Sequence, residues 1–470
     1  MLEYNSPGDH TMAAVPNSPH ARDIASLMHG MTNLAKHEKD GPLILEEGKG
    51  IYVKDLEGKE YIEGMAGLWC TSLGFSNERL INAAVAQMRK LPTYHTFFHR
   101  SNMPAIELAE KLLSIAPTPM SKVWFANSGS EANDHMVKFV WYYNNALDRP
   151  NKKKIIARHE GYHGIAVSSG SLTGLPLMHK GFDLPIPNIL HTGSHHYYRH
   201  AHAGESQEAF ASRRAEELEQ LILAEGADTV AAFVAEPVMG AGGAIIPPRT
   251  YFEKIQAVLR KYDVLMVADE VITGFHRTGN TFACQTYGIK PDMLVIAKQL
   301  SSAYMPISAV LLNEKVYGPI RDFSARNSAL GTGFTYSGHP VPAAVAVETL
   351  KIYDELDIGA HVRKVSILAQ QRLAALGSHA LVGDASGVGL IGSVELVKDK
   401  ETKENFGPEV AAFCADACAE HGLMLRACAD TRVAFCPPLI IDEDQVNMLF
   451  DRWQLALDDT LEHVRSNGLM

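Results

Sequence analysis

The sequence predicts an α/β fold in which a mostly parallel β-sheet is covered by helices. The first observation is a set of short, almost entirely apolar runs without polar alternation, a pattern typical of strands buried on both faces. The runs are Val123–Phe125, Ile155–Ala157, Val230–Ala235, Val264–Ala268 and Met293–Ala297. The second observation is that helical patterns separate most of them, such as Thr250–Lys261 between the third and the fourth. Strands and helices that alternate in this way form parallel βαβ units.

The segment before the sheet predicts an arm, a hairpin and two helices. Residues 1–21 contain turn formers and no hydrophobic period, so we expect a mobile arm or one that lies on a partner. Residues 51–62 predict two short strands around a glycine-containing turn. Helices are expected at about Asn77–Lys90 and Pro104–Ile115.

The segment after about Pro340 predicts a smaller α+β unit. Helical patterns at Ala343–Glu355 and His361–Leu376 precede short strands and a terminal helix near Glu443–Asn467. The expected division is a mobile arm (1–21), the N-terminal part of a small domain (22–75), a large domain (76–340) and the C-terminal part of the small domain (341–470).

Composition argues against several classes of protein. The 470 residues are 46% hydrophobic and 21% charged, as in globular rather than disordered chains. Lys and Arg number 43 against 54 Asp and Glu, and the net charge of −11 argues against nucleic acid as a partner. The six cysteines form no C-x-x-C pair, so we expect reduced thiols. No run approaches the roughly 18 apolar residues of a membrane span, and the first twenty residues do not resemble a signal peptide. We therefore expect a cytoplasmic enzyme that binds no membrane.

Polar or glycine-rich groups follow all five apolar runs. They are Asn127-Ser128-Gly129-Ser130-Glu131, Arg158-His159-Glu160-Gly161-Tyr162-His163-Gly164, Glu236, Asp269-Glu270 and Lys298. In open α/β sheets, ligands bind beyond the carboxyl ends of the parallel strands. Because buried charges are costly unless they are paired or liganded, this pattern predicts a binding site at that edge of the sheet.

Ser128, Gly129 and Ser130 precede Glu131 at the start of a helix expected to run to about Asn145. Free N–H groups, small residues and hydroxyls at a helix N-terminus form a phosphate site. An ordinary N-cap, with Glu131 in the first turn, explains the same residues equally well. The motif by itself leaves both interpretations open.

Asp269 and Lys298 each follow an apolar run and are expected to be nearly buried. A structural ion pair is the alternative for Asp269, and a lysine that extends to solvent is the alternative for Lys298. A desolvated lysine has a lowered pKa and becomes a nucleophile towards carbonyls. With a helix N-terminus for phosphate and Tyr162 to stack on a ring, these residues predict a site for a phosphorylated, protonated aromatic aldehyde, which is pyridoxal phosphate chemistry.

From about residue 25 to its end, the chain resembles the class III (ω-type) aminotransferases of the fold-type I pyridoxal phosphate enzymes. The motifs that carry the resemblance are Gly67-Leu68-Trp69, Asn127-Ser128-Gly129-Ser130-Glu131-Ala132, Gly161-Tyr162-His163-Gly164, Ala235-Glu236-Pro237, Asp269-Glu270-Val271-Ile272-Thr273-Gly274-Phe275, Ala297-Lys298 and Gly333-Phe334-Thr335-Tyr336-Ser337-Gly338-His339-Pro340. The resemblance implies a homodimer with active sites at the subunit interface.

The resemblance also implies roles for individual residues. Lys298 would carry the cofactor as an imine and move the proton between the substrate Cα and the cofactor. Asp269 would pair with the pyridinium nitrogen, and Val271 and Tyr162 would lie on the two faces of the ring. Residues 128–130 would bind the phosphate.

Three further residues complete this set. The resemblance implies that Thr335 reaches the phosphate from the neighbouring subunit, that Glu236 lies near the cofactor and the substrate, and that Trp69 lines the substrate pocket. No metal ligand is implied.

Leu425-Arg426-Ala427-Cys428-Ala429-Asp430 is similar to the segment that carries a mobile arginine in the pyruvate-using amine transaminases. Arg426 would then bind the substrate carboxylate and swing away for an amine that lacks one. The alternative is a surface arginine.

The expected activity is ping-pong transfer of an amino group from an amine or ω-amino acid to a keto acid, with pyruvate as the expected acceptor. Use of 2-oxoglutarate, decarboxylation and an aminomutase reaction are alternatives within the family, and a catalytically silent cofactor-binding protein is an alternative outside catalysis.

Some features depart from the family pattern. The family commonly has Lys-Gly-Leu and Ser-Gly-Tyr where this chain has Gln299 and Ala303 in the middle positions, so the shape of the pocket is in question. His191, His195, His196, His200 and His202 fit no familiar zinc spacing, and a solvated loop is expected there. Residues 387–392 match G-x-G-x-x-G, which would favour a nicotinamide dehydrogenase. The residues that follow predict a strand instead of the helix that this fingerprint requires.

Overall fold

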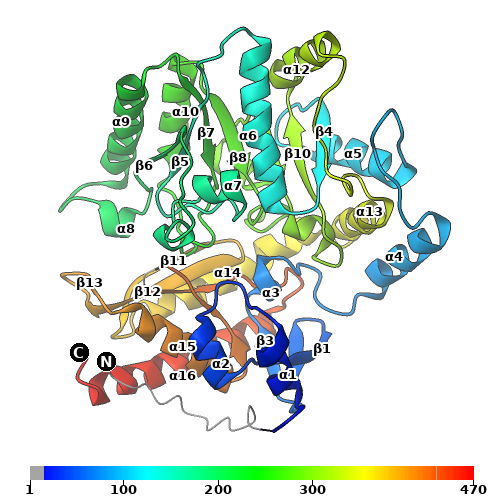
Figure 1. Cartoon of the computed structure of the whole chain (residues 1–470). Helices are drawn as coiled ribbons and strands as arrows, with labels where there is room; N and C mark the ends of the chain where they lie inside the picture. The colour runs from blue at the N-terminus through cyan, green and yellow to red at the C-terminus, as the bar shows by residue number, and fades with distance from the viewer. Residues whose placement is uncertain (1–14, 430) are drawn as a thin grey trace.

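The large domain is built on a seven-stranded sheet with helices on both faces (Figure 1). The computed structural model describes residues 15–429 and 431–470. The strand order is β4-β10-β9-β8-β7-β5-β6. Their bounds are β4 Lys122–Ala126, β5 Lys154–Arg158, β6 Ile189–Thr192, β7 Val230–Ala235, β8 Leu265–Asp269, β9 Met293–Ile296 and β10 Ser308–Leu312. All five apolar runs form strands, and neighbours from β9 to β6 pair in parallel, so the α/β prediction is confirmed.

Two strands of this sheet were not predicted. β6 is an edge strand of four residues, and β10 lies between β4 and β9 and is antiparallel to both. β10 is short and wholly buried, and its sequence meets the same criterion as the five apolar runs; its antiparallel place between β4 and β9 is set by tertiary packing.

The strands have apolar side chains on both faces, which explains their lack of polar alternation. Along β8, Met266 and Ala268 belong to the core on one face, and Leu265 and Val267 belong to the core on the other. Because successive side chains of a strand point to opposite faces, helices must cover both faces of such a sheet.

The helices around the sheet are α4 Glu78–Lys90, α5 Met103–Ile115, α6 Gly129–Ala146, α7 Val167–Leu172, α9 Gln207–Glu225, α10 Tyr251–Lys261, α11 Ala283–Tyr287, α12 Glu314–Arg326 and α13 Pro340–Glu355. Five of them, α4, α5, α6, α10 and α13, begin and end close to their predicted bounds, and the other four were not predicted. α4 shows how local chemistry sets a start, since the Asn77 side chain accepts a hydrogen bond from the Arg79 N–H at 3.1 Å.

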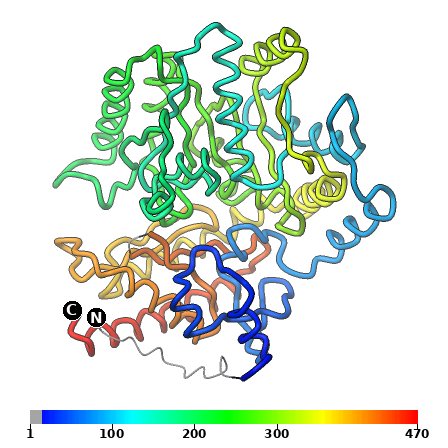
Figure 2. The backbone as a smooth tube through the Cα atoms, in the orientation of Figure 1, coloured from blue at the N-terminus to red at the C-terminus, as the bar shows by residue number. Residues whose placement is uncertain are grey.

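The small domain combines both ends of the described chain. One sheet has the order β1-β2-β3-β14, in which β14 pairs in parallel with β3, so the blue and orange segments lie side by side in Figure 2. A second sheet has the order β11-β12-β16-β15, with β13 beside β12. The strands are β1 Leu45–Lys49, β2 Tyr52–Asp55, β3 Glu60–Glu63, β11 Val382–Val388, β12 Ile391–Asp399, β13 Glu404–Asn405, β14 Leu423–Met424, β15 Arg426–Ala427 and β16 Arg432–Phe435.

Helices α14 Ile358–Leu376, α15 Pro408–Glu420 and α16 Glu443–Ser466 pack on these sheets.

The chain's first described helices are α1 Pro19–Ser26 and α2 Leu34–Asp40. Helix α1 therefore begins within the predicted arm of residues 1–21, and residues 1–14 of that arm lie outside the described residues. No helix of the described chain has the length and apolarity that crossing a membrane requires.

The G-x-G-x-x-G match is the turn of a hairpin. Gly387 and Gly392 pair with each other across β11 and β12, and Gly389 has a φ of 58°. A side chain at Gly389 would place its Cβ 2.3 Å from the Arg277 carbonyl oxygen, so the glycine permits close packing. A strand follows the glycines, as predicted, and the dinucleotide interpretation has no support.

The prediction of a solvated histidine loop is wrong for three of its members. His191 lies within β6 and is half-buried, and its Nε2 lies 3.1 Å from the Leu172 carbonyl oxygen. His195 and His196 are buried, because the segment after β6 packs against the loop that carries Ile245 and, through His196, against Arg432 of β16. Buried polar groups need partners. His195 lies 2.6 Å from an Arg158 nitrogen and 3.0 Å from the Ile245 carbonyl oxygen, and His196 Nε2 lies 2.9 Å from the Arg432 guanidinium.

The buried carboxyl group of Glu63, at the end of β3, should make the free energy of unfolding depend on pH. Its side chain accepts the Met65 N–H at 2.9 Å, and it forms no ion pair within the described residues. Burial raises its pKa from 4.5 to about 7. The folded state therefore holds the proton more tightly than the unfolded state, and stability falls as pH rises from about 4.5 to about 7. We expect Glu63→Gln to raise the free energy of unfolding by up to roughly 3 kcal/mol at pH 8 and to leave it nearly unchanged near pH 4.5.

Thermal or urea unfolding of the holoenzyme at the two pH values measures this difference. Glu60→Gln is the matched control, because Glu60 is an exposed carboxylate on the same strand. An equal gain from Glu63→Gln at both pH values would contradict the explanation.

Candidate active site

Asp269 lies at the carboxyl end of β8, where it is 3% exposed. One carboxylate oxygen accepts hydrogen bonds from Asn133 Nδ2 and His163 Nδ1, both at 2.8 Å. The other oxygen accepts the Val271 N–H at 3.1 Å. No lysine or arginine pairs with Asp269 within the described residues. The alternative of a structural ion pair therefore depends only on the contact between Asp269 and His163.

Lys298 follows β9 and begins a short 3₁₀ helix, η3 Lys298–Ser301. It is half-buried, and its φ of 49° is unusual for a residue with a side chain. Surrounding protein atoms disfavour the ammonium form and lower the pKa of Lys298, while Asp269 and Glu236 partly oppose this shift. The pKa of the lysine is therefore displaced in the direction that a nucleophile or general base requires.

Glu236 follows β7 and holds the backbone of two neighbouring loops. Its Oε1 accepts the Tyr162 N–H at 2.8 Å, and its Oε2 accepts the Gly240 N–H at 2.9 Å. Burial raises the pKa of Glu236. Since the N–H of Tyr162 is bound in this way, the tyrosine is fixed beside the strand ends.

The N-terminus of α6 lies between Val271 and the loop before α7. Ser128 Oγ accepts the Glu131 N–H at 3.2 Å, so Ser128 is an N-cap. Ser130 Oγ accepts the Ile165 N–H at 3.2 Å. At Gly129, an added Cβ would lie 3.3 Å from Val271, so the glycine allows the helix end to approach that residue closely. The N-cap is compatible with a phosphate site, because the other N–H groups of the first turn have no partner inside the helix.

Trp69 and Arg426 come from the small-domain side. Trp69 is 1% exposed, packs with Met65 and Ile272, and has an indole N–H without a hydrogen bond within the described chain. Arg426 is half-buried on β15. Arg426 pairs with Ala434 of β16, and Ala434 belongs to the same buried cluster as Trp69, so Arg426 lies on the sheet face that Trp69 packs against. Asp430, the last residue of the arginine motif, lies outside the described residues.

Thr335 is the predicted residue that this chain does not bring to the strand ends. It is exposed in the loop before α13, and no hydrogen bond in the described part of the chain joins it to the residues around Lys298.

Two residues of the site were not singled out from the sequence. His163 was part of the glycine-rich motif, and Asn133 lies one turn into α6 on its buried face. The positions of Asn133 and Gly129, four residues apart and hence on one helix face, were the available signal for Asn133.

Gln299, the departure after the lysine, donates to the Ile272 carbonyl at 2.6 Å and accepts from Arg277 at 3.4 Å. It therefore tethers the loop after Asp269 instead of leaving a gap.

Residues 34–457 match the family model described as "Aminotransferase class-III". The chain belongs to the class III aminotransferases. Among solved structures, it is similar to the omega transaminase from Pseudomonas jessenii in complex with PMP, with a TM-score of 0.94, 56% identity, and coverage of 95% of this chain and 99% of that one. A structure described as "Transaminase with L-ala" has a TM-score of 0.89 and 56% identity over 90% of this chain and 100% of that one.

Curated relatives include "Gamma-aminobutyrate transaminase 1, mitochondrial" of Oryza sativa subsp. japonica, which is 49% identical over 426 residues, 90% of this chain and 82% of that protein. "Gamma aminobutyrate transaminase 3, chloroplastic" of Solanum lycopersicum is 48% identical over the same shares of the two chains. The family resemblance, the fold-type I architecture, the aminotransferase class and pyridoxal phosphate as cofactor are thereby confirmed.

The residues at the strand ends fit this cofactor. Asp269 offers a buried carboxylate with a lone-pair position beyond the three N–H groups it already accepts. Gly129 allows the N-terminus of α6 to lie close to Val271 and Ala297. Lys298, the residue after Ala297, supplies an amine with a lowered pKa.

Proposed function

We propose that this aminotransferase moves an amino group from an amine or ω-amino acid to pyruvate by a ping-pong mechanism. The observation that carries the proposal is the position of Arg426 on β15, directly opposite Ala434, which packs in one cluster with Trp69. A guanidinium at a pocket binds a keto-acid carboxylate in a fork. Two comparisons support it. A neighbour at 56% identity is described with L-alanine, which is the amino acid formed from pyruvate, and the curated relatives are named for a γ-amino acid.

The proposed mechanism assigns one task to each residue. When bound, the cofactor supplies an electrophilic carbonyl and an electron sink for charge at the substrate Cα. Asp269 would hold its ring nitrogen in the protonated form, and residues 128–130 would hold its phosphate. Lys298 Nζ, with its lowered pKa, accepts and returns the proton at the substrate Cα. Arg426 orients the carboxylate of the acceptor, and the buried Trp69 limits the size of the substituent.

We also propose a homodimer with active sites at the subunit interface. Exposed Phe98 and Tyr336 lie on loops that are tied to each other, because Asn102 Nδ2 donates to the Gly338 carbonyl at 2.8 Å. Exposed aromatic side chains on a rigid face are typical of a protein contact, and Thr335 lies on the same loop. A monomeric mass of the holoenzyme in solution would contradict the dimer.

Half-reactions with alternative acceptors test the proposed function. The amino form of the holoenzyme is prepared with an amine donor, and its return to the starting spectrum is followed with pyruvate and with 2-oxoglutarate. We expect a second-order rate with pyruvate at least about 10-fold higher, equivalent to about 1.4 kcal/mol of transition-state binding. Faster reaction with 2-oxoglutarate would favour the second acceptor, and release of CO₂ or an isomerised amino acid would favour a decarboxylase or an aminomutase.

Arg426→Ala separates the role of the arginine from general damage. The variant is expected to lose rate with pyruvate while it keeps its rate with an amine donor that lacks a carboxylate. Arg79→Ala is the control, because Arg79 is a surface arginine paired with Glu348 and Glu355. Equal losses for both substrates would indicate that Arg426 has only a structural role.

A further inference from the structure

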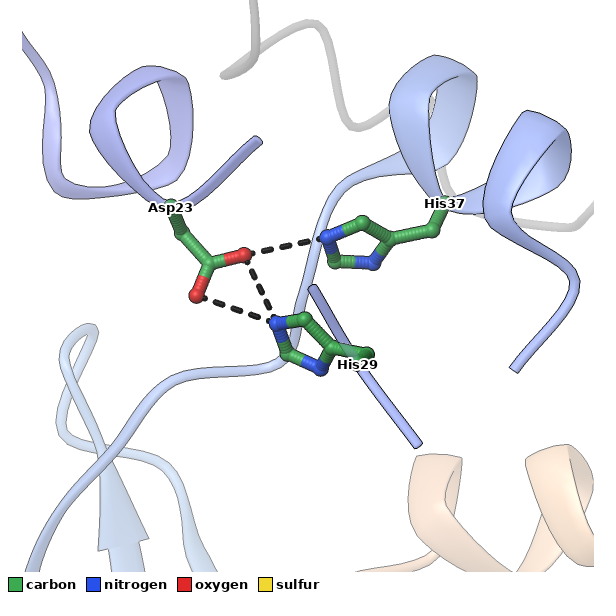
Figure 3. Close-up of side chains that lie close together, drawn as sticks. All are labelled: Asp23, His29 and His37. Atoms are coloured by element: carbon green, nitrogen blue, oxygen red, sulfur yellow. Dashed lines mark hydrogen bonds and ion pairs between the residues drawn. The ribbon is translucent and has the colours of Figure 1, made fainter. Parts of the chain in front are cut away.

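Asp23, His29 and His37 bring three metal-ligand atoms close together in the first described part of the chain (Figure 3). Asp23 lies on α1, His29 lies in the connection, and His37 lies on α2. His29 Nε2 lies 2.9 and 3.1 Å from the two carboxylate oxygens of Asp23, and His37 Nε2 lies 3.0 Å from the first of them. The two rings are 4.1 Å apart between centroids.

We propose that Asp23, His29 and His37 form a binding site for a divalent transition-metal ion of the zinc class, which fastens α1 to α2. Two imidazoles and one carboxylate are a common ligand set for zinc, and Nε2 is available on both histidines. Zinc bonds of about 2.0–2.2 Å in a tetrahedron place neighbouring ligand atoms about 3.3 Å apart. The observed separations of 2.9–3.1 Å need only small side-chain shifts to admit the ion.

The charge around Asp23 favours a cation at this position. Its side chain is 16% exposed, and its only ion-pair partners within the described residues are the two histidines. No lysine or arginine therefore competes for the carboxylate. His29 is 30% exposed, which leaves a route for an ion and for a water as fourth ligand.

The packing of this segment gives the ion a structural task. Helix α1 has eight residues and none is buried, and in α2 only His37 is buried. Segments with so few buried contacts open readily, and small units that lack a core use metals as an alternative source of stability. The three ligands come from both helices and their connection, so one ion would hold all three parts.

A second cluster, Glu160, His196 and His200, is a weaker candidate. There, His196 Nε2 already lies 2.9 Å from the Arg432 guanidinium and 3.3 Å from Glu395. A fixed positive charge in contact with the imidazole opposes a second cation, so this cluster is better explained as a buried ion-pair network.

Zinc titration of the untagged holoenzyme, after treatment with a chelator and dialysis, tests the proposal. We expect one Zn²⁺ per chain by calorimetry, and slower amide exchange in residues 19–40 on binding. Asp23→Asn, His29→Gln and His37→Gln should each weaken binding by more than about 100-fold, because even outer-shell changes cost about 10- to 100-fold. Each should also abolish the Zn²⁺-dependent protection of residues 19–40.

Two matched variants complete the design. His20→Gln removes another histidine from α1, and His200→Gln removes a ligand of the second cluster; both should bind Zn²⁺ as the unaltered enzyme does. Asp23→Asn keeps the shape of the side chain, so it guards against a variant that merely unfolds the segment. Absence of binding, or binding that survives in the His29 and His37 variants, would show that these residues are an ion-pair cluster only.

Discussion

Lys298→Ala is expected to lower amine-dependent turnover by more than about 10,000-fold, because the change removes the amine that holds the cofactor and moves the proton. The geometry supports this role. Lys298 directly follows a buried strand, has a strained backbone, and has a pKa lowered by its surroundings. Steady-state rates with saturating donor and pyruvate measure the loss, and the visible spectrum of the purified variant should lack the band of the lysine-bound cofactor.

Lys152→Ala is the control for this experiment. Lys152 is buried, and burial lowers its pKa as it does for Lys298, yet its ammonium donates to the Tyr262 carbonyl at 3.2 Å, away from the strand ends described above. We expect it to affect stability while the rate per folded active site stays close to that of the unaltered enzyme. Turnover by Lys298→Ala at the unaltered rate would show that the assigned lysine is wrong.

Asp269→Asn is expected to lower kcat/KM by roughly 150- to 5,000-fold. The substitution keeps the size of the side chain and removes the negative charge that would face the cofactor ring. Removal of one member of a buried charge pair costs about 3–5 kcal/mol, which corresponds to this range. The three N–H donors to Asp269 also lose part of their acceptor, so a lower affinity for the cofactor should accompany the loss of rate.

Asp292→Asn provides the matched comparison. Asp292 precedes β9 and accepts the Met266 N–H at 3.0 Å, so it lies at the amino end of β9, opposite to Lys298. We expect its substitution to cost stability and to leave kcat/KM per bound cofactor nearly unchanged. Similar kinetic losses in both variants would mean that Asp269 acts only through the fold.

Much of the site was predictable because its residues follow strands that local composition reveals. A run such as Val264–Ala268 excludes polar residues along its length, so the first carboxylate after it, Asp269, is conspicuous. Similarly, Ser128 could be predicted as a helix start, since capping depends on residues within one turn. The buried histidines 195 and 196 could not be predicted in this way. Their burial depends on residues far along the chain, since His195 contacts the Ile245 carbonyl oxygen and His196 contacts Arg432.

The sequence by itself determined the βαβ rhythm, the polar residues at the strand ends and the motifs of the family, because these depend on near neighbours in the chain. The tertiary structure alone decided which of them meet. Asn133 and His163 reach Asp269 across 136 and 106 residues, and Asp23 meets His37 only because two short helices fold back on each other. Hydrogen bonds of this kind are set by the packing of whole elements, for which local sequence carries no periodic signal.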